Sequence, residues 1–208
     1  DSAAVRVSSD RLVAVVCDGA GSSKKAHIGA RLASEAVADY MASVLAEIDP
    51  SDPLSLRPEA EQAVKEARSR IAATLERGET RHDYNATLVA IVGNSRGSAF
   101  FHIGDGLALA SIPAHLHDGE GNPRINYWAL TGVSLPDNGE YANETFFLTQ
   151  HGWRERLRIT PLRRVPELAV LLSDGPEDLV MQDGRPNSAF IDVVVHQCSH
   201  MPTGADRD

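Results

Sequence analysis

The chain has 208 residues, of which 42% are hydrophobic and 24% are charged, and its formal net charge is -9. This composition is typical of a globular protein. Its Lys and Arg residues do not cluster, which argues against a partner such as nucleic acid or an anionic membrane. The two cysteines, Cys17 and Cys198, are too few for a disulfide framework and predict free thiols in a reducing compartment.

No apolar run approaches the roughly 18 residues that a membrane-spanning helix needs. We therefore expect a soluble protein. The free thiols favour a cytoplasmic location, and we expect a monomer. Residues 1–208 contain no internal repeat and no linker, so we expect a single domain. Because the sequence begins at Asp1 without a Met and ends without a terminating feature, we expect short segments to be missing at both ends.

The first third of the chain predicts one strand followed by two helices. Leu12–Cys17 is a short, continuous apolar run, which predicts a strand buried on both faces. Apolar residues at helical spacing then predict an amphipathic helix over Ile28–Ile48. After a proline-containing break, the same spacing predicts a second helix over Ala60–Leu75, with Pro58 in its first turn and Gly78 after its end.

The middle of the chain changes to the pattern of strands, with candidates at Thr87–Val92, Ser98–Ile103 and Leu107–Ile112. The turn-rich "NSRG" separates the first pair and Asp105-Gly106 the second, which predicts an antiparallel meander. Weaker strand patterns follow at Tyr127–Leu130, Thr145–Thr149 and Leu157–Ile159.

The last strong strand pattern is Leu168–Ser173, and a short helical stretch follows it. Apolar residues beyond Asn187 then recur at helical spacing, which favours a terminal helix capped by Asn187 or Ser188. The order of strand, two helices, several strands and helix predicts an α+β fold, with helices layered on antiparallel sheet.

Three carboxylates stand out from the pattern of turns. Asp-Gly occurs five times, at positions 18, 105, 118, 174 and 183, and a turn is the simplest explanation for most of them. Asp18, Asp105 and Asp174 differ because each ends a strongly apolar run. A carboxylate at the end of a buried strand is partly desolvated, which is unfavourable unless cations or hydrogen-bond donors compensate.

Such carboxylates are suited to hard divalent cations. Mg²⁺ and Mn²⁺ prefer oxygen ligands, and a neighbouring glycine lets a backbone carbonyl approach the same ion. Two ions about 3.5 to 4 Å apart can activate a water and hold the oxygens of a phosphoryl group. Bound cations would explain how an acidic protein accepts a phosphorylated ligand.

Three segments, in this order, resemble the signature blocks of the metal-dependent serine/threonine protein phosphatases of the 2C type. They are "VVCDGAGSSKKAHIGARLASEAV", "NATLVAIVGNSRGSAFFHIGDG" and "LAVLLSDGPEDLV", and "GEYANETFFL" resembles a bacterial branch of that family. The resemblance spans Asp1 to Asp208. It implies a four-layer α-β-β-α sandwich that hydrolyses phosphoserine and phosphothreonine in proteins. The expected partners are a phosphorylated protein and a cognate Ser/Thr kinase.

The resemblance also implies roles for individual residues. Asp18 matches the ligand that bridges two ions, Asp174 matches a second ligand, and these two carry the catalytic role. Two or three Mn²⁺ or Mg²⁺ ions are implied. The implied metal ligands are Asp1, Asp18, the carbonyl of Gly19, Asp105 for a third and weaker ion, Asp174 and Asp208, with Asp206 as the alternative to Asp208.

Departures from the family pattern leave alternatives open. Ala20 stands where some members have a general-acid histidine, Ser22 replaces a glycine, and Gly106-Leu107 replaces Ser-Arg after Asp105. These differences keep open a catalytically weak or inactive pseudophosphatase that acts as a regulatory binding module. They also leave Asp105 open to a hairpin-turn role.

A zinc hydrolase is a further alternative. His196 and His200 lie one helical turn apart, as in zinc proteases, but Gln197 stands where the catalytic glutamate is required and the sequence offers no third ligand.

Overall fold

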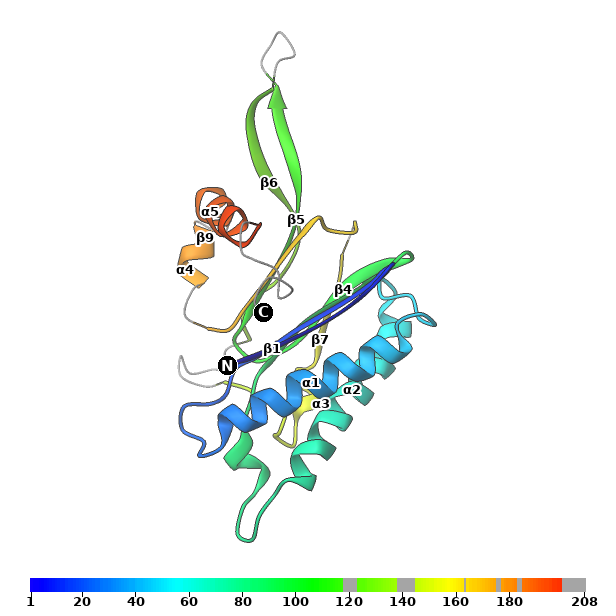
Figure 1. Cartoon of the computed structure of the whole chain (residues 1–208), viewed down its shortest axis with the longest axis vertical. Helices are drawn as coiled ribbons and strands as arrows, with labels where there is room; N and C mark the ends of the chain where they lie inside the picture. The colour runs from blue at the N-terminus through cyan, green and yellow to red at the C-terminus, as the bar shows by residue number, and fades with distance from the viewer. Residues whose placement is uncertain (118–122, 138–144, 163, 175–176, 183–184, 200–208) are drawn as a thin grey trace, which may run out of the picture.

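The structure is a computed structural model of the whole chain, and it describes residues 1–117, 123–137, 145–162, 164–174, 177–182 and 185–199. Within these ranges, no helix combines the length and the apolar character needed to cross a membrane. Two sheets packed face to face, with helices on their outer sides, form the architecture (Figure 1).

The larger sheet has five antiparallel strands in the order β1-β2-β3-β4-β7. On β2 the side chains of Val13, Val15 and Cys17 are buried while Leu12 is exposed, so the strand has one fully buried face and not the two that were predicted. The bounds of these strands are β1 Ser2–Ser8, β2 Arg11–Cys17, β3 Leu88–Asn94, β4 Gly97–Ile103 and β7 Arg158–Pro161.

Helices α1 (Ala26–Val44) and α2 (Pro53–Ala73) cover the outer face of this sheet (Figure 1). Both bury many small apolar residues, which lets them pack closely on each other and on the strands. The Asp52 carboxylate caps α2 by accepting the N–H of Leu54 at 3.0 Å. Pro58 therefore lies inside α2, and the prediction that it occupies the first turn was wrong.

The second sheet has three antiparallel strands in the order β6-β5-β8, with β5 at Leu107–His117, β6 at Pro123–Ser134 and β8 at Leu168–Leu172. Its inner face packs on the larger sheet through an apolar cluster of Val89, Ile91, Phe100, Ala108, Ala110 and Leu162. The β5–β6 hairpin extends beyond this contact, away from the helices α1 and α2 (Figure 1).

The outer face of the second sheet is covered by α4 (Glu177–Val180) and α5 (Ser188–Ser199). Buried Leu107 and Leu109 on β5 pack there against Val180 and Ile191. The Asn187 side chain caps α5 by accepting the N–H of Phe190 at 3.3 Å, which confirms the predicted terminal helix. The layers are helix, sheet, sheet and helix, as the resemblance to the 2C-type phosphatases implied.

The predicted meander is wrong at Asp105-Gly106. Strands β3 and β4 form a hairpin, but β5 pairs with β6 and β8 and not with β4. The segment between Ile103 and Leu107 is therefore a crossover from one sheet to the other. Gly104 makes this turn with φ at +106°, a conformation that side chains other than glycine rarely adopt. The hairpin explanation for Asp105 is therefore excluded.

Several shorter elements also differ from prediction. Strand β1 and the helix α3 (Trp153–Arg156) were not predicted, and residues 145–149 form no strand. On strand β1 the side chains of Val5 and Val7 share one face and are exposed, while Ala4 on the other face is buried. The remaining elements are a 3-10 helix at Arg81–Tyr84 and the two-residue strands β9 (Met181–Gln182) and β10 (Arg185–Pro186).

Candidate active site

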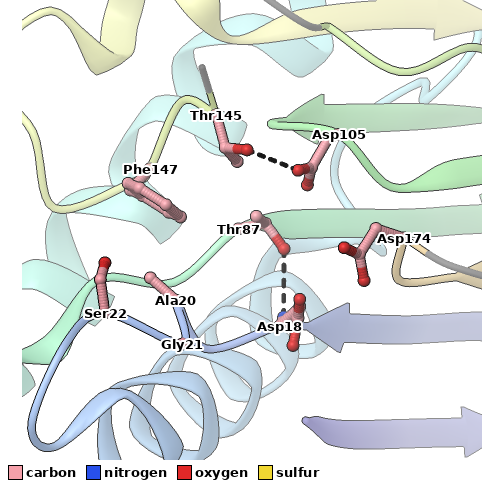
Figure 2. A pocket seen from close by; sticks show the side chains of 9 residues that line it. All are labelled: Asp18, Ala20, Gly21, Ser22, Thr87, Asp105, Thr145, Phe147 and Asp174. Carbon is pink, nitrogen blue, oxygen red and sulfur yellow. Dashed lines mark hydrogen bonds between the residues drawn. The ribbon is translucent and has the colours of Figure 1, made fainter. Parts of the chain in front are cut away.

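Three aspartates from distant parts of the sequence line one pocket of about 390 Å³. Asp18 follows the last residue of β2, Asp105 lies in the crossover from β4 to β5, and Asp174 lies just beyond β8. Figure 2 shows their carboxylates around a shared space at one end of the two sheets. The other described residues that line it are Ala20, Gly21, Ser22, Thr87, Thr145 and Phe147.

Asp18 is fixed by its backbone to the start of β3. Its N–H donates to Thr87 Oγ1 at 3.1 Å, and its C=O accepts the N–H of Thr87 at 2.8 Å. Gly19 continues this pairing as an isolated bridge to Ala86. The carboxylate of Asp18 is thereby held at the rim of the pocket without using either of its own oxygens in these bonds.

Asp105 is held from both its backbone and its side chain. The C=O of Gly104 accepts the N–H of Asp137 at 2.9 Å, which anchors the crossover loop. The hydroxyl of Thr145 donates to Asp105 Oδ2 at 2.6 Å, as the dashed line in Figure 2 marks. This carboxylate therefore has a defined orientation beside Asp18 and Asp174.

Asp174 lines the pocket and is exposed. The preceding Ser173 donates its hydroxyl to Asp1 Oδ2 at 3.3 Å, which places the Asp1 carboxylate close to the end of β8. Asp1 thus lies near the predicted site, although it is not among the residues that line the pocket.

The electrostatics of the pocket are dominated by negative charge. Burial and the neighbouring Asp174 carboxylate raise the pKa of Asp18 above its ordinary value. None of the described lining residues is basic. The carboxylates therefore lack a cationic partner from the described lining, and a bound cation would lower the electrostatic free energy of the site.

Cys17 precedes Asp18, but its chemistry is unsuited to the site. The thiol is buried and free, and burial together with the charge of Asp18 raises its pKa far above the ordinary range. A thiol in this state is not a nucleophile at neutral pH. The side chain of Cys198 lies outside the described part of the structure.

The donor set fits Mg²⁺ or Mn²⁺ in its chemistry, because the described lining offers carboxylates and hydroxyls and no sulfur or imidazole. In the described ranges, however, no three His, Cys, Asp or Glu side chains are already gathered closely enough to hold one ion. The three aspartates face one space without forming a preassembled cluster.

The remaining predicted residues have different outcomes. Gly19 lies beside the pocket but does not line it, and a role for its carbonyl stays a prediction. Asp206, Asp208 and His200 lie outside the described residues. His196 lies on α5, away from the residues that line the pocket.

Two threonines of the pocket were not predicted. Thr87 could have been found, because it stands immediately before the apolar run of β3, where a side chain reaches the same sheet edge as Asp18. Thr145 gave no usable signal. It lies 40 residues from its partner Asp105, and the strand predicted for residues 145–149 does not form.

A family model described as Protein phosphatase 2C matches residues 1–203. The chain belongs to the protein phosphatase 2C family. This match confirms the resemblance carried by the three sequence blocks. A search of the curated proteins found no match.

Solved structures of two bacterial proteins share the fold of this protein phosphatase 2C family member. A Stage II Sporulation E family protein from Thermanaerovibrio acidaminovorans has 18% sequence identity, a TM-score of 0.51, and coverage of 97% of this chain and 95% of that chain. PppA, a key regulatory component of T6SS in Pseudomonas aeruginosa, has 17% identity, a TM-score of 0.51, and coverage of 93% and 82%. These similarities support the four-layer arrangement.

Proposed function

We propose that this member of the protein phosphatase 2C family hydrolyses phosphoserine and phosphothreonine in proteins, with Mn²⁺ or Mg²⁺ as its cofactor. The observation that carries the proposal is the meeting of Asp18, Asp105 and Asp174 at one pocket whose described lining has no basic residue. A phosphorylated substrate is dianionic and would be repelled by these carboxylates alone. Divalent cations reconcile the acidic pocket with such a substrate.

The residues that would hold two or three ions are those at the strand ends. Asp18, Asp174, Asp1 and the Gly19 carbonyl would hold two ions, with Asp18 shared between them, and Asp105 would hold a third. Asp208 would complete the set from the C-terminal segment. When bound, the ions would lower the pKa of a water and neutralise the phosphoryl charge.

The chain's own residues contribute position and shape. Thr87 fixes the backbone of Asp18, which holds the point of attachment of its carboxylate at the pocket. The hydroxyl of Ser22 lines the pocket and is a neutral group able to donate to phosphoryl oxygens. Phe147 provides an apolar wall against which the carbon atoms of a substrate side chain can pack.

The described lining contains no cysteine and no histidine, so it offers neither a thiolate nucleophile nor an imidazole to protonate the leaving group. Cys17 is protonated and buried, and Ala20 occupies the position where some family members have a histidine. We therefore propose direct attack by water, with the leaving group protonated by water and not by a side chain of the described lining. The substrate would be a phosphoprotein made by a cognate Ser/Thr kinase, and we propose that the chain acts as a cytoplasmic, monomeric, single-domain enzyme.

A regulatory pseudophosphatase is the second candidate, and two observations favour it. The carboxylates are not gathered into a preassembled cluster in the described residues. Gly106 also has no room for the family's serine, because a Cβ there would lie 2.5 Å from Val89 Cγ2 and 2.6 Å from the Leu172 carbonyl oxygen. This candidate would retain the fold and bind a partner without turnover.

Hydrolysis of a phosphothreonine peptide by the purified chain separates these candidates. We expect phosphate release that requires Mn²⁺ or Mg²⁺, is abolished by EDTA, and falls at least a hundredfold in Asp18→Asn and in Asp174→Asn. The matched control is Asp10→Asn, which removes a carboxylate from the distant β1–β2 turn. No metal-dependent release by the wild-type chain would favour the pseudophosphatase, whereas equal release by all three variants would contradict the roles proposed for Asp18 and Asp174.

A further inference from the structure

The side chain of Asp105 has its own hydrogen-bond donor inside the pocket. Thr145 Oγ1 donates to Asp105 Oδ2 at 2.6 Å, and both residues line the pocket and are partly buried. This distance is typical of a hydroxyl that donates to an ionised carboxylate. The bond joins the crossover loop to a segment 40 residues further along the chain.

The backbone on which Asp105 sits is already fixed. The Gly104 carbonyl accepts the N–H of Asp137 at 2.9 Å and lies 3.5 Å from the Arg158 guanidinium. Gly104 is also closely enclosed, because a Cβ there would lie 2.8 Å from both Thr87 Cγ2 and the Phe146 carbonyl oxygen. With the loop enclosed in this way, the rotation of the Asp105 side chain is the main remaining freedom.

We propose that Thr145 is the positioning residue of Asp105, setting the carboxylate so that one oxygen is occupied by the hydroxyl and the other is presented to a divalent cation. This inference rests on the proposed function, because it assigns Asp105 to a metal ion. Thr145 itself is not a catalytic residue in this role. It acts through Asp105.

The chemistry of the donor matters as much as its position. A hydroxyl orients the carboxylate without neutralising it, whereas a Lys or Arg at this position would compete with the cation for its charge. The hydroxyl also leaves free lone pairs on both carboxylate oxygens. Partners that orient a metal ligand in this way typically change metal affinity by about 10- to 100-fold when they are removed.

Direct binding of Mn²⁺ to the full chain tests the inference, with free Mn²⁺ measured by electron paramagnetic resonance. Thr145→Val keeps the shape of the side chain and removes the hydroxyl, and Thr145→Ser keeps the hydroxyl. We expect Asp105→Asn to lose one class of Mn²⁺ sites. We expect Thr145→Val to lower the affinity of that same class of sites by about 10- to 100-fold. Thr145→Ser should bind Mn²⁺ as the wild-type chain does.

The double variant Thr145→Val with Asp105→Asn completes the test. If Thr145 acts through Asp105, removing its hydroxyl has no further effect once Asp105 is gone. Unchanged Mn²⁺ binding in Thr145→Val would overturn the inference. The same loss of Mn²⁺ affinity from Thr145→Val in the wild-type chain and in the Asp105→Asn variant would also overturn it. Thr145→Ala repeats the comparison should the valine variant fail to show the wild-type circular dichroism spectrum.

The two proposals can fail separately. Mn²⁺ binding that depends on Thr145 in a chain without phosphatase activity would remove the proposed function and leave the positioning role intact. Metal-dependent hydrolysis by a chain whose Mn²⁺ binding is unaffected by Thr145→Val would support the proposed function and overturn the positioning role of Thr145. A wild-type chain that binds no Mn²⁺ would overturn both.

Discussion

Thr87 binds both backbone polar groups of Asp18: its hydroxyl accepts the Asp18 N–H at 3.1 Å, and its own N–H donates to the Asp18 carbonyl at 2.8 Å. The two residues are 69 positions apart in the sequence. This pairing joins the end of β2 to the start of β3 at the rim of the pocket. The backbone that carries the carboxylate proposed to bridge two ions is therefore fixed by the sheet and not by a flexible loop.

The first prediction follows from this pairing. Thr87→Val removes the hydroxyl that accepts the Asp18 N–H, which should destabilise the protein by about 1 kcal/mol, the typical value of one hydrogen bond. It should also lower Mn²⁺ affinity, since the ligand is less well held. Urea unfolding in EDTA and Mn²⁺ titration measure the two effects. Thr87→Ser keeps the hydroxyl and should behave as wild type, and a valine variant indistinguishable from the serine variant would contradict the prediction.

The second prediction concerns Asp18 in the metal-free protein. Its pKa is raised by burial and by the charge of Asp174, so the folded state binds its proton more tightly than the unfolded state does. The contribution of Asp18 to stability therefore falls as the pH rises from the unfolded pKa through the raised folded pKa, and above that value the ionised carboxylate is unfavourable. Asp18→Asn should raise the melting temperature at pH 7 in EDTA.

Manganese should reverse the order of the two melting temperatures, so that the wild-type chain becomes more stable than Asp18→Asn. At saturating Mn²⁺ the wild-type chain should gain stability by binding the ion, while Asp18→Asn should gain much less. Thermal unfolding with and without Mn²⁺ makes the comparison. A lower melting temperature for the variant in EDTA at pH 7 would show that the negative charge is not a source of instability.

The third prediction concerns Gly106, where β5 begins. Gly106→Ala should destabilise the chain by about 1 to 3 kcal/mol, because the new Cβ meets the side chain of Val89 and the backbone of Leu172. Gly21→Ala is the matched control, since its Cβ would have nothing within 4 Å, and it should change stability by less than about 0.5 kcal/mol. Equal unfolding midpoints in urea for the two variants would contradict the packing argument.

The fourth prediction concerns His102, which is buried between the two sheets. Its Nδ1 lies 2.9 Å from Ser134 Oγ and 3.0 Å from Arg158 Nη2, while no partner for Nε2 is found in the described structure. Burial and the charge of Arg158 lower the pKa of His102 to about 3. The folded state therefore keeps the imidazole neutral at pH values where the unfolded chain protonates it.

The pH dependence that follows has the opposite sign to that of Asp18. The stability from neutral His102 is fully present above the unfolded pKa of 6.5 and is lost as the pH falls from there towards about 3. His102→Gln cannot titrate and should show a flatter loss of unfolding free energy between pH 6.5 and pH 4. Urea unfolding across this range measures the slopes. If the unfolding free energies of the wild-type chain and His102→Gln fell with the same slope over this pH range, the lowered pKa of His102 would be contradicted.

The strands that carry Asp18 and Asp174 were predictable from sequence because each is a continuous apolar run that stops at a carboxylate. A continuous run of apolar residues is visible in the local sequence without knowledge of distant contacts. The run over residues 12–17 therefore corresponds closely to β2, and the run over residues 168–173 corresponds closely to β8. The resemblance of three sequence segments to the signature blocks of the 2C-type phosphatases then predicted that both residues belong to one site.

The surroundings of Asp105 could not be predicted in this way. An Asp-Gly between two apolar runs is the usual sequence of a hairpin, and only the pairing of β5 with β6 and β8 shows that the chain crosses between sheets. The contact with Thr145 depends on that crossover and on the path of a distant loop. Long-range contacts of this kind leave no periodic signal in a single sequence.

The metal site is tested most directly by anomalous diffraction at the manganese edge from crystals of the full chain grown with MnCl₂. We predict strong peaks within coordination distance, about 2.0 to 2.2 Å, of carboxylate oxygens of Asp18 and Asp174, and a weaker peak beside Asp105. Crystals of Asp18→Asn should lose the first peaks. A fully ordered pocket without manganese between Asp18 and Asp174 would contradict the central claim that these carboxylates form a metal-dependent phosphatase site.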